Sequence, residues 1–154
     1  RKKAENTRMA EWHLRHATAG DADAFASCIR AAYAVYEERI TDLPAVADGI
    51  VDDIENHRVW VVEIDQQVVG GIVLILQETC LLVANVAVQP DWAGLGLGGA
   101  LMAHAEMKCR EHGRSELRLS THVDMPETIG LYAHLGWEET GRDGNRVLMR
   151  KAIG

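Results

Sequence analysis

Four glycines fall within six residues near the middle of the chain, and this cluster constrains the fold more than any other feature. The run from Val86 to Met102 reads V-A-V-Q-P-D-W-A-G-L-G-L-G-G-A-L-M, in which a strand ends, glycines follow and an amphipathic helix begins. Glycine accepts φ > 0 and lets the backbone approach a ligand, while the free amides at a helix start attract anions. The run therefore predicts a phosphate cradle. The plain alternative is a loop that only needs tight turns.

The segment Gly94–Gly99 also satisfies G-x-G-x-x-G, the pattern of dinucleotide-binding loops. That pattern normally occupies the first strand–helix turn of a repeated βαβ series. Here it follows a meander of strands at mid-chain, which is not the position that a dinucleotide-binding loop normally occupies. A Walker-type nucleotide loop is excluded because no Gly-Lys-Ser or Gly-Lys-Thr follows the glycines.

Hydrophobic spacing predicts a strand, two helices and a strand meander before the glycines. The first strand covers Trp12–His16, and Thr18 with Asp21 resembles a helix-capping pair. The elements expected next are a helix with Phe25, Ile29, Ala32 and Tyr36 on one face, a helix with Val46, Ile50 and Ile54 after Pro44, strands over 59–64 and 68–76 joined across Asp65-Gln66-Gln67, and a strand over 80–88 that ends before Pro90.

After the glycines the pattern predicts a helix, a strand, a second helix and a last pair of strands. These are a helix with Leu97, Leu101, Ala105 and Cys109 on one face that ends at Gly113, a strand over 116–121, a helix over 126–135, and two strands around the turn Asp143-Gly144. We expect an α+β fold in the order β-α-α-β-β-β-α-β-α-β-β. Its sheet should be mixed and mostly antiparallel, parallel only around the central crossover helix, and flanked by about four helices.

Domain limits follow from length and local composition. The polar, basic segment 1–8 is expected to be a disordered leader or a piece foreign to the domain. The segment 9–154 has the length of one compact domain.

Composition narrows the class of partners. Sixteen basic against 23 acidic side chains give a formal charge of −7, which argues against nucleic-acid binding and mildly favours a cationic partner. No apolar run reaches the roughly 18–20 residues that a membrane span needs. Cys28, Cys80 and Cys109 lie far apart in apolar patterns, so we expect buried, reduced thiols of a cytoplasmic protein. The histidines lack H-x-x-x-H and H-E-x-x-H spacing, so no metal site is expected.

Two segments resemble motifs of the GNAT superfamily of N-acetyltransferases. V-A-V-Q-P followed by G-L-G-L-G-G-A-L-M is similar to motif A, and I-G-L-Y-A-H-L-G-W over Ile129–Trp137 is similar to motif B, usually x-x-L-Y-x-x-x-G-F. The spacing and the element order match over nearly the whole domain, from about Trp12 to Lys151. Two motifs in the right order identify the family more specifically than either alone.

The resemblance implies acetyl-CoA as cosubstrate and assigns its binding residues. The residues implied to contact pantetheine through main-chain groups are Val86, Ala87 and Val88, and those implied to wrap the pyrophosphate are Ala93, Gly94, Leu95, Gly96, Leu97, Gly98 and Gly99. The chain departs from the family at three points. Ala93 stands where Gln or Arg is usual, Gly94 and Gly99 replace residues that are often basic, and Met125 stands where motif B often has Asn.

Tyr132 matches the motif B tyrosine that many relatives use to protonate the departing thiolate. Without the resemblance, a helical tyrosine beside Leu131, Leu135 and Trp137 is more simply a packing residue. An ammonium with a reference pKa of about 10.4 must also lose a proton before it attacks a thioester. The general base is left open among Glu37, Glu78, His122, Asp124 and a water chain.

The family implies that the acceptor site is built from two segments. They are 33–48, with Tyr36, Glu37, Glu38, Arg39 and Asp42, and 137–146. The expected function is direct transfer of an acetyl group to a primary amine of a small molecule or peptide, by a monomer or a homodimer. Two alternatives stay open: a non-catalytic acyl-CoA-binding module and, on the glycine pattern alone, a dinucleotide binder.

Overall fold

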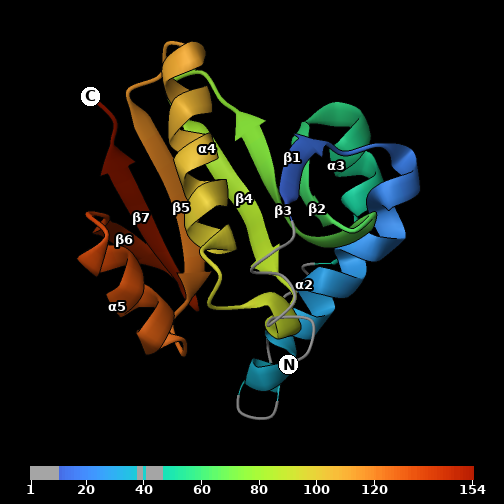
Figure 1. Cartoon of the computed structure of the whole chain (residues 1–154). Helices are drawn as coiled ribbons and strands as arrows, with labels where there is room; N and C mark the ends of the chain where they lie inside the picture. The colour runs from blue at the N-terminus through green and yellow to red at the C-terminus, as the bar shows by residue number, and fades with distance from the viewer. Residues whose placement is uncertain (1–10, 38–39, 41–46) are drawn as a thin grey trace. The chain divides into compact units, whose positions relative to one another are not determined.

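A computed structural model describes residues 11–37, 40 and 47–154 of the chain. The elements, in chain order, are β1 (Trp12–His16), η1 (Ala19–Asp21), α2 (Ala22–Glu37), α3 (Ile50–Asn56), β2 (Arg58–Ile64), β3 (Gln67–Leu76), β4 (Leu81–Val88), η2 (Pro90–Trp92), α4 (Leu97–Glu111), β5 (Glu116–His122), α5 (Pro126–His134), β6 (Glu138–Asp143) and β7 (Arg146–Ala152). Within the described residues the strands form a seven-stranded sheet in the order β1-β2-β3-β4-β5-β7-β6. The predicted α+β fold and its element order are confirmed (Figure 1).

The chain divides into two compact units, each considered by itself below. The first holds the described residues up to Leu74 together with Asn85–Met102, and the second holds Ile75–Ala84 and Ala103–Gly154. The prediction of a single domain over 9–154 stays a prediction.

In the described part of the chain, no helix has the length and apolar character needed to cross a membrane.

The first unit contains the β1–β2–β3 meander. Both ladders are antiparallel, and the β2–β3 hairpin closes through Asp65 and Gln66, whose φ values are 51° and 66°. Positive φ at both central residues is the geometry of a two-residue type I′ turn, whose twist matches that of the flanking strands. The predicted three-residue connection is therefore one residue too long, because Gln67 already pairs with Ile64 in β3.

Two adjacent glycines let β3 pack tightly inside the first unit. A Cβ on Gly70 would lie 2.8 Å from the Ala87 carbonyl oxygen, and a Cβ on Gly71 would lie 2.7 Å from the Trp60 carbonyl oxygen. Neither position has room for a side chain. A register shift beside Val69 turns its carbonyl toward Gln89, whose N–H donates to it at 2.7 Å. The end of β4 is thereby held against β3.

An ionic cluster fastens the start of α2 to β1 and β2. Arg15 donates through Nη1 to Asp21 Oδ2 at 2.8 Å and through Nη2 to Asp21 Oδ1 at 3.0 Å, and it also reaches Glu63 Oε2 at 3.3 Å. The Thr18 N–H donates to Asp21 Oδ2 at 2.8 Å. This is one of the two reciprocal hydrogen bonds that define a capping box, the pattern predicted for Thr18 and Asp21. The Asp21 side chain is only 12% exposed, and the Arg15 guanidinium lowers the pKa of its carboxyl to about 2.

The helices of the first unit partly match the prediction. Phe25 and Ile29 on the predicted face of α2 are fully buried. Helix α3 begins at Ile50 after Gly49, whose φ is 85°. The part of the expected second helix at Val46, and its break at Pro44, lie outside the described residues.

The second unit pairs the start of β4 with β5 and continues through β7 to β6. The β4–β5 ladder is parallel, as predicted for the strands around the crossover helix, and the β5–β7 and β6–β7 ladders are antiparallel. Lys151 Nζ on β7 lies 2.8 Å from Glu106 Oε2 on α4, which fixes that helix to one face of these strands. The last turn consists of Gly144 and Asn145, one residue beyond the predicted pair, because β6 extends through Asp143.

The three cysteines are buried free thiols, as predicted. Cys28 donates to the Val68 carbonyl at 3.6 Å and Cys109 to the Arg114 carbonyl at 3.3 Å. Burial raises the pKa of Cys28 to about 11, so this thiol is protonated and poorly nucleophilic near neutral pH.

The ionic cluster predicts an acid-sensitive contribution to stability. Because Arg15 lowers the pKa of Asp21 from 3.8 to about 2, the carboxylate stabilises the fold above pH 4, and this contribution is lost as the pH falls from 4 to 2. Asp21→Asn should cost about 1–2 kcal/mol at pH 7, allowing for the partly exposed Arg15, and about half of that at pH 3.

Urea unfolding of parent and variant at pH 7 and pH 3 measures this difference. Asp23→Asn is the matched control, because Asp23 is an exposed acid two residues along the chain. It should change the free energy of unfolding by less than about 0.5 kcal/mol. A loss for Asp21→Asn that does not depend on pH would contradict the assignment.

Candidate functional site

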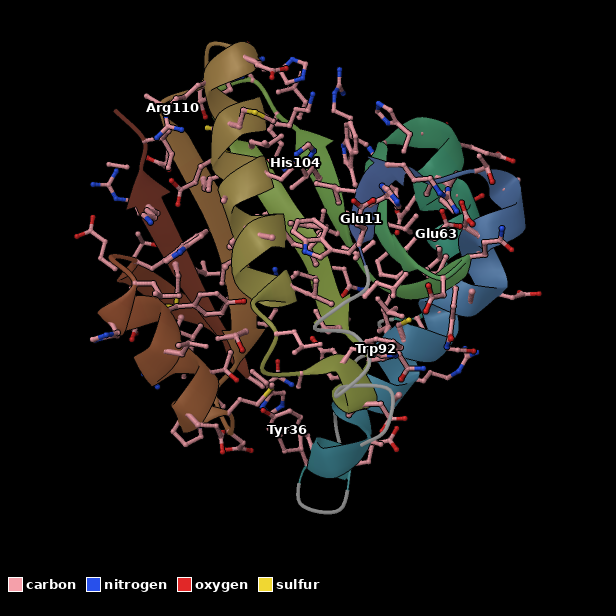
Figure 2. The ribbon with its side chains drawn as sticks, viewed as in Figure 1. Glu11, Tyr36, Glu63, Trp92, His104 and Arg110 are labelled. Carbon is pink, nitrogen blue, oxygen red and sulfur yellow. The ribbon has the colours of Figure 1, made fainter. Side chains whose placement is uncertain are left out.

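The segment between β4 and α4 consists of the short helical turn η2 and the glycine loop that follows it. After Val88 the chain forms η2, in which Trp92 N–H donates to the Gln89 carbonyl at 2.9 Å and Ala93 N–H donates to the Pro90 carbonyl at 3.1 Å. Trp92, labelled in Figure 2, is 4% exposed. A buried indole at this point holds the beginning of the glycine loop in place.

The glycine loop turns its backbone toward open space. Gly94 and Gly96 have φ values of 82° and 83°, which a residue with a Cβ adopts only at a cost of about 1–2 kcal/mol. A Cβ built on Gly94, Gly96, Gly98 or Gly99 would meet no atom of the chain within 4 Å. Backbone conformation therefore favours glycine at Gly94 and Gly96, and internal crowding explains none of the four glycines.

Helix α4 begins directly at this loop. Leu97 is 2% exposed and anchors the first turn, while Ala100 N–H donates to the Gly96 carbonyl at 3.0 Å. The amides before Ala100 have no acceptor one helical turn behind them, as at any α-helix start. Together with the helix dipole they form a surface suited to an anion. The phosphate cradle predicted from the glycine pattern stays a prediction at this position.

Strand β4 leads into the loop with part of its backbone outside the β5 ladder. That ladder holds the pairs Leu81↔Leu117 and Leu82↔Arg118 in the second unit, whereas Val86–Val88 belong to the first. Ala87 is buried and its two neighbours are half-buried. Main-chain groups of a strand beyond the end of its ladder can pair with an extended ligand.

Tyr132 lies on α5 in the second unit, whereas the glycine loop belongs to the first. Its ring centroid is 5.6 Å from that of Trp137, at an interplanar angle of 60°, and its carbonyl accepts from Trp137 N–H at 3.0 Å. Tyr132 is half-buried and Trp137 is 5% exposed. The ring of Tyr132 therefore packs against Trp137. This contact does not determine what the phenolic hydroxyl does.

The four residues considered as general base differ in their surroundings. Glu37 and Glu78 are exposed, and the Asp124 side chain is 67% exposed. His122 is buried, and its Nδ1 accepts a hydrogen bond from Asp124 N–H at 3.0 Å. A neutral ring whose Nδ1 accepts carries its proton on Nε2. This arrangement counts against His122 as a base, because its unprotonated nitrogen is already engaged.

Met125 occupies the position where motif B often has Asn. It is 6% exposed and directly precedes α5, and its carbonyl accepts from the N–H groups of Thr128 and Ile129 at 3.1 Å each. An apolar side chain here packs under the start of the helix.

The two segments proposed for the acceptor lie in different units. In the first, Tyr33 and Tyr36 have ring centroids 6.4 Å apart, and burial raises the pKa of Tyr33. Glu38, Arg39 and Asp42 lie outside the described residues. In the second unit, the segment 137–146 contains β6 and its turn.

Sequence reasoning missed two groups of charged residues. The Arg15–Glu63 contact joins residues 48 apart in the chain, and three arginines of β5 and β7 share one face of the second unit. The alternation of side chains between the two faces of β5 and β7 could have revealed the second group.

Within the described residues, no three His, Cys, Asp or Glu side chains gather as a metal site.

Comparisons with known proteins agree with this geometry. A sequence profile of the Acetyltransferase (GNAT) domain matches residues 55–139. The Escherichia coli K12 protein named "Uncharacterized N-acetyltransferase YjgM" is 32% identical over 136 residues, covering 81% of this chain and 81% of that protein.

Solved structures share the fold. The PaiA N-acetyltransferase of Thermoplasma acidophilum in complex with coenzyme A has a TM-score of 0.82 at 16% identity, covering 92% of this chain and 99% of that chain. The ribosomal-protein-S18-alanine N-acetyltransferase of Escherichia coli has a TM-score of 0.76 at 17% identity, covering 94% and 95%. The fold is that of the N-acetyltransferases. The chain belongs to the GNAT acetyltransferase family.

Proposed function

We propose that the protein binds acetyl-CoA and transfers its acetyl group directly to a primary amine of a small molecule or peptide. The observation that carries this proposal is the glycine loop. Gly94 and Gly96 hold it in a conformation with φ > 0, its Cβ positions face open space, and it leads into the first turn of α4. Membership of the GNAT family and a neighbour solved with coenzyme A support the choice of ligand.

We assign the diphosphate to the loop formed by Ala93, Gly94, Leu95, Gly96, Leu97, Gly98 and Gly99. The Ala93 N–H already donates to the Pro90 carbonyl, so the backbone amides that follow it are the proposed donors. The described loop offers no cationic side chain between Gln89 and Ala100, so amide hydrogen bonds and the helix dipole must supply the attraction. Pantetheine would pair with main-chain groups of Val86, Ala87 and Val88, beyond the end of the β4–β5 ladder. A backbone N–H of that segment would also stabilise the oxyanion.

The reaction needs two proton movements. The amine nitrogen forms a bond to the acetyl carbon as the carbon–sulfur bond breaks, and the nitrogen releases a proton to a base or to water. The thiolate receives a proton, and we assign the phenolic hydroxyl of Tyr132 as its donor. Its packing against Trp137 would hold the ring in one orientation.

Ligand-dependent stability tests the proposal directly. Acetyl-CoA should raise the melting temperature, and at one hundred times its dissociation constant it should add about 2.7 kcal/mol to the free energy of unfolding. NAD should leave the melting temperature unchanged, because the glycines follow an antiparallel meander and do not open a repeated βαβ series. Equal shifts with both ligands, or no shift with millimolar acetyl-CoA, would remove the cosubstrate assignment.

Gly98→Ala separates the ligand role of the loop from its folding role. Gly98 lies in the first turn of α4 without a positive φ, so the added methyl should stabilise the free protein by about 0.5–1 kcal/mol. The same methyl would stand where the diphosphate approaches and should weaken CoA binding by about tenfold. Isothermal titration measures the affinity, and urea unfolding measures the stability.

Gly141→Ala is the matched control for that variant. Gly141 lies on β6, has no positive φ and also has open space at its Cβ. It should leave CoA affinity within twofold of the parent. If Gly98→Ala also binds CoA within twofold, the loop is not the cradle.

Tyr132→Phe tests the assignment of Tyr132 as the proton donor to the thiolate. The variant keeps the ring and its contact with Trp137 but removes the proton donor. Since general acid catalysis is worth about 10²- to 10⁴-fold, turnover should fall by at least about tenfold, with CoA affinity and melting temperature unchanged. The assay follows CoA release with a primary amine found by a pooled screen. Turnover above half of the parent value, with chemistry rate-limiting, would leave Tyr132 a packing residue only.

A further inference from the structure

A groove of about 300 Å³ opens on one face of the second unit. Strand alternation defines this face. Lys151 of β7 points to α4, where it pairs with Glu106, so Arg146, Leu148 and Arg150 point away from that helix. The residues that line the groove come from β4, β5, β6 and β7, and the ones used below are Leu82, Glu116, Arg118, Ser120, Arg146, Leu148 and Arg150.

The groove is basic, although the chain carries a formal charge of −7. Three arginines line it against a single glutamate. Glu116 binds two of these arginines. Its carboxylate accepts one hydrogen bond from Arg118 Nε and another, at 2.8 Å, from Arg150 Nη1. A second carboxylate, Glu138 on β6, accepts from Arg150 Nε at 2.6 Å. Arg118 and Arg150 are thus held in position by two carboxylates.

Arg146 differs from the other two arginines. Its Nη2 donates to a neutral hydroxyl, Ser120 Oγ, at 3.1 Å. A guanidinium has five N–H donors in a planar fork that matches a carboxylate or a phosphate. Leu82 and Leu148 lie half-buried on the same face, in register with Arg118 and Ser120. Within the described residues, the groove therefore combines a guanidinium that is hydrogen-bonded to a hydroxyl and to no carboxylate with a short apolar wall.

We propose that this groove binds the carboxylate or phosphate group of a small molecule, with Arg146 as its principal contact. Arg118 and Arg150 add positive charge, and the two leucines contact the carbon body of the ligand. The long-range field of an acidic chain repels anions, so recognition depends on the local fork of donors. This site lies wholly within the second unit and goes beyond the proposed acetyl transfer.

Binding of simple anions tests the site without any acetyl transfer. Inorganic phosphate and succinate are titrated into the full chain at fixed ionic strength, and backbone amide shifts of β5 and β7 are followed by NMR. Both anions should bind with saturable shifts centred on Ser120 and Arg146, and chloride should not. Arg146→Gln should weaken binding by at least about tenfold, because a charged, bidentate contact is lost.

Arg142→Gln is the matched control. Arg142 is an exposed arginine of the same hairpin, pairs with Glu139 at 2.7 Å and does not line the groove. This variant should bind both anions within twofold of the parent, and both variants should keep the parent melting temperature. Equal affinity in parent and Arg146→Gln, or equal shifts with chloride, would overturn the proposal.

Competition identifies the source of the anionic group. A primary amine that carries a carboxylate, its uncharged amide and CoA each compete with succinate. Displacement by the acid but not by its amide assigns the groove to an acid-bearing acceptor, and displacement by CoA assigns it to a CoA phosphate. Either assignment holds only if the displacement of succinate is lost in Arg146→Gln. Displacement that persists in this variant contradicts the proposed site. Failure of acetyl-CoA to stabilise the fold would leave this binding result intact, so the two proposals fail separately.

Discussion

The first unit depends on the close approach of β3 to the strands on either side of it. Gly70 lies with its Cβ position 2.8 Å from the Ala87 carbonyl, and Gly71 lies with its Cβ position 2.8 Å from Phe25 Cε1. Real Cβ atoms do not come this close, so any side chain would push β3 away from the end of β4 and from the core of α2. The Gln89–Val69 hydrogen bond depends on the same approach, and it holds the chain where the glycine loop begins.

Glycine therefore serves two opposite purposes within one unit. In β3 it removes a Cβ that would collide with neighbouring backbone. In the loop after β4 it permits φ > 0 while the backbone faces open space, which leaves amide groups accessible. A side chain at Gly70 or Gly71 would therefore collide with neighbouring atoms, whereas a side chain at Gly98 or Gly99 would meet no atom of the chain within 4 Å.

Charged side chains on this acidic chain are arranged in local groups with different consequences. Arg15, Asp21 and Glu63 form a partly buried cluster in which hydrogen bonds lower the pKa of an acid and secure the start of a helix. On β5 and β7 the pairs are more exposed, so they contribute little to stability and leave guanidinium donors facing solvent. Family membership indicates the class of reaction, and it does not by itself identify the acceptor.

The sequence by itself determined the order and nearly all limits of the elements, because hydrophobic period, caps and glycines act over a few residues. A local pattern also predicted the glycine loop between β4 and α4, and the positive φ of Gly94 and Gly96 lies within it. Tertiary structure decided the rest. The two-residue turn at Asp65 and Gln66 follows from strand twist and register, and no glycine marks it. The groove beside Arg146 depends on contacts between β5 and β7. Such contacts join residues distant in the chain, and no local period encodes which of them meet.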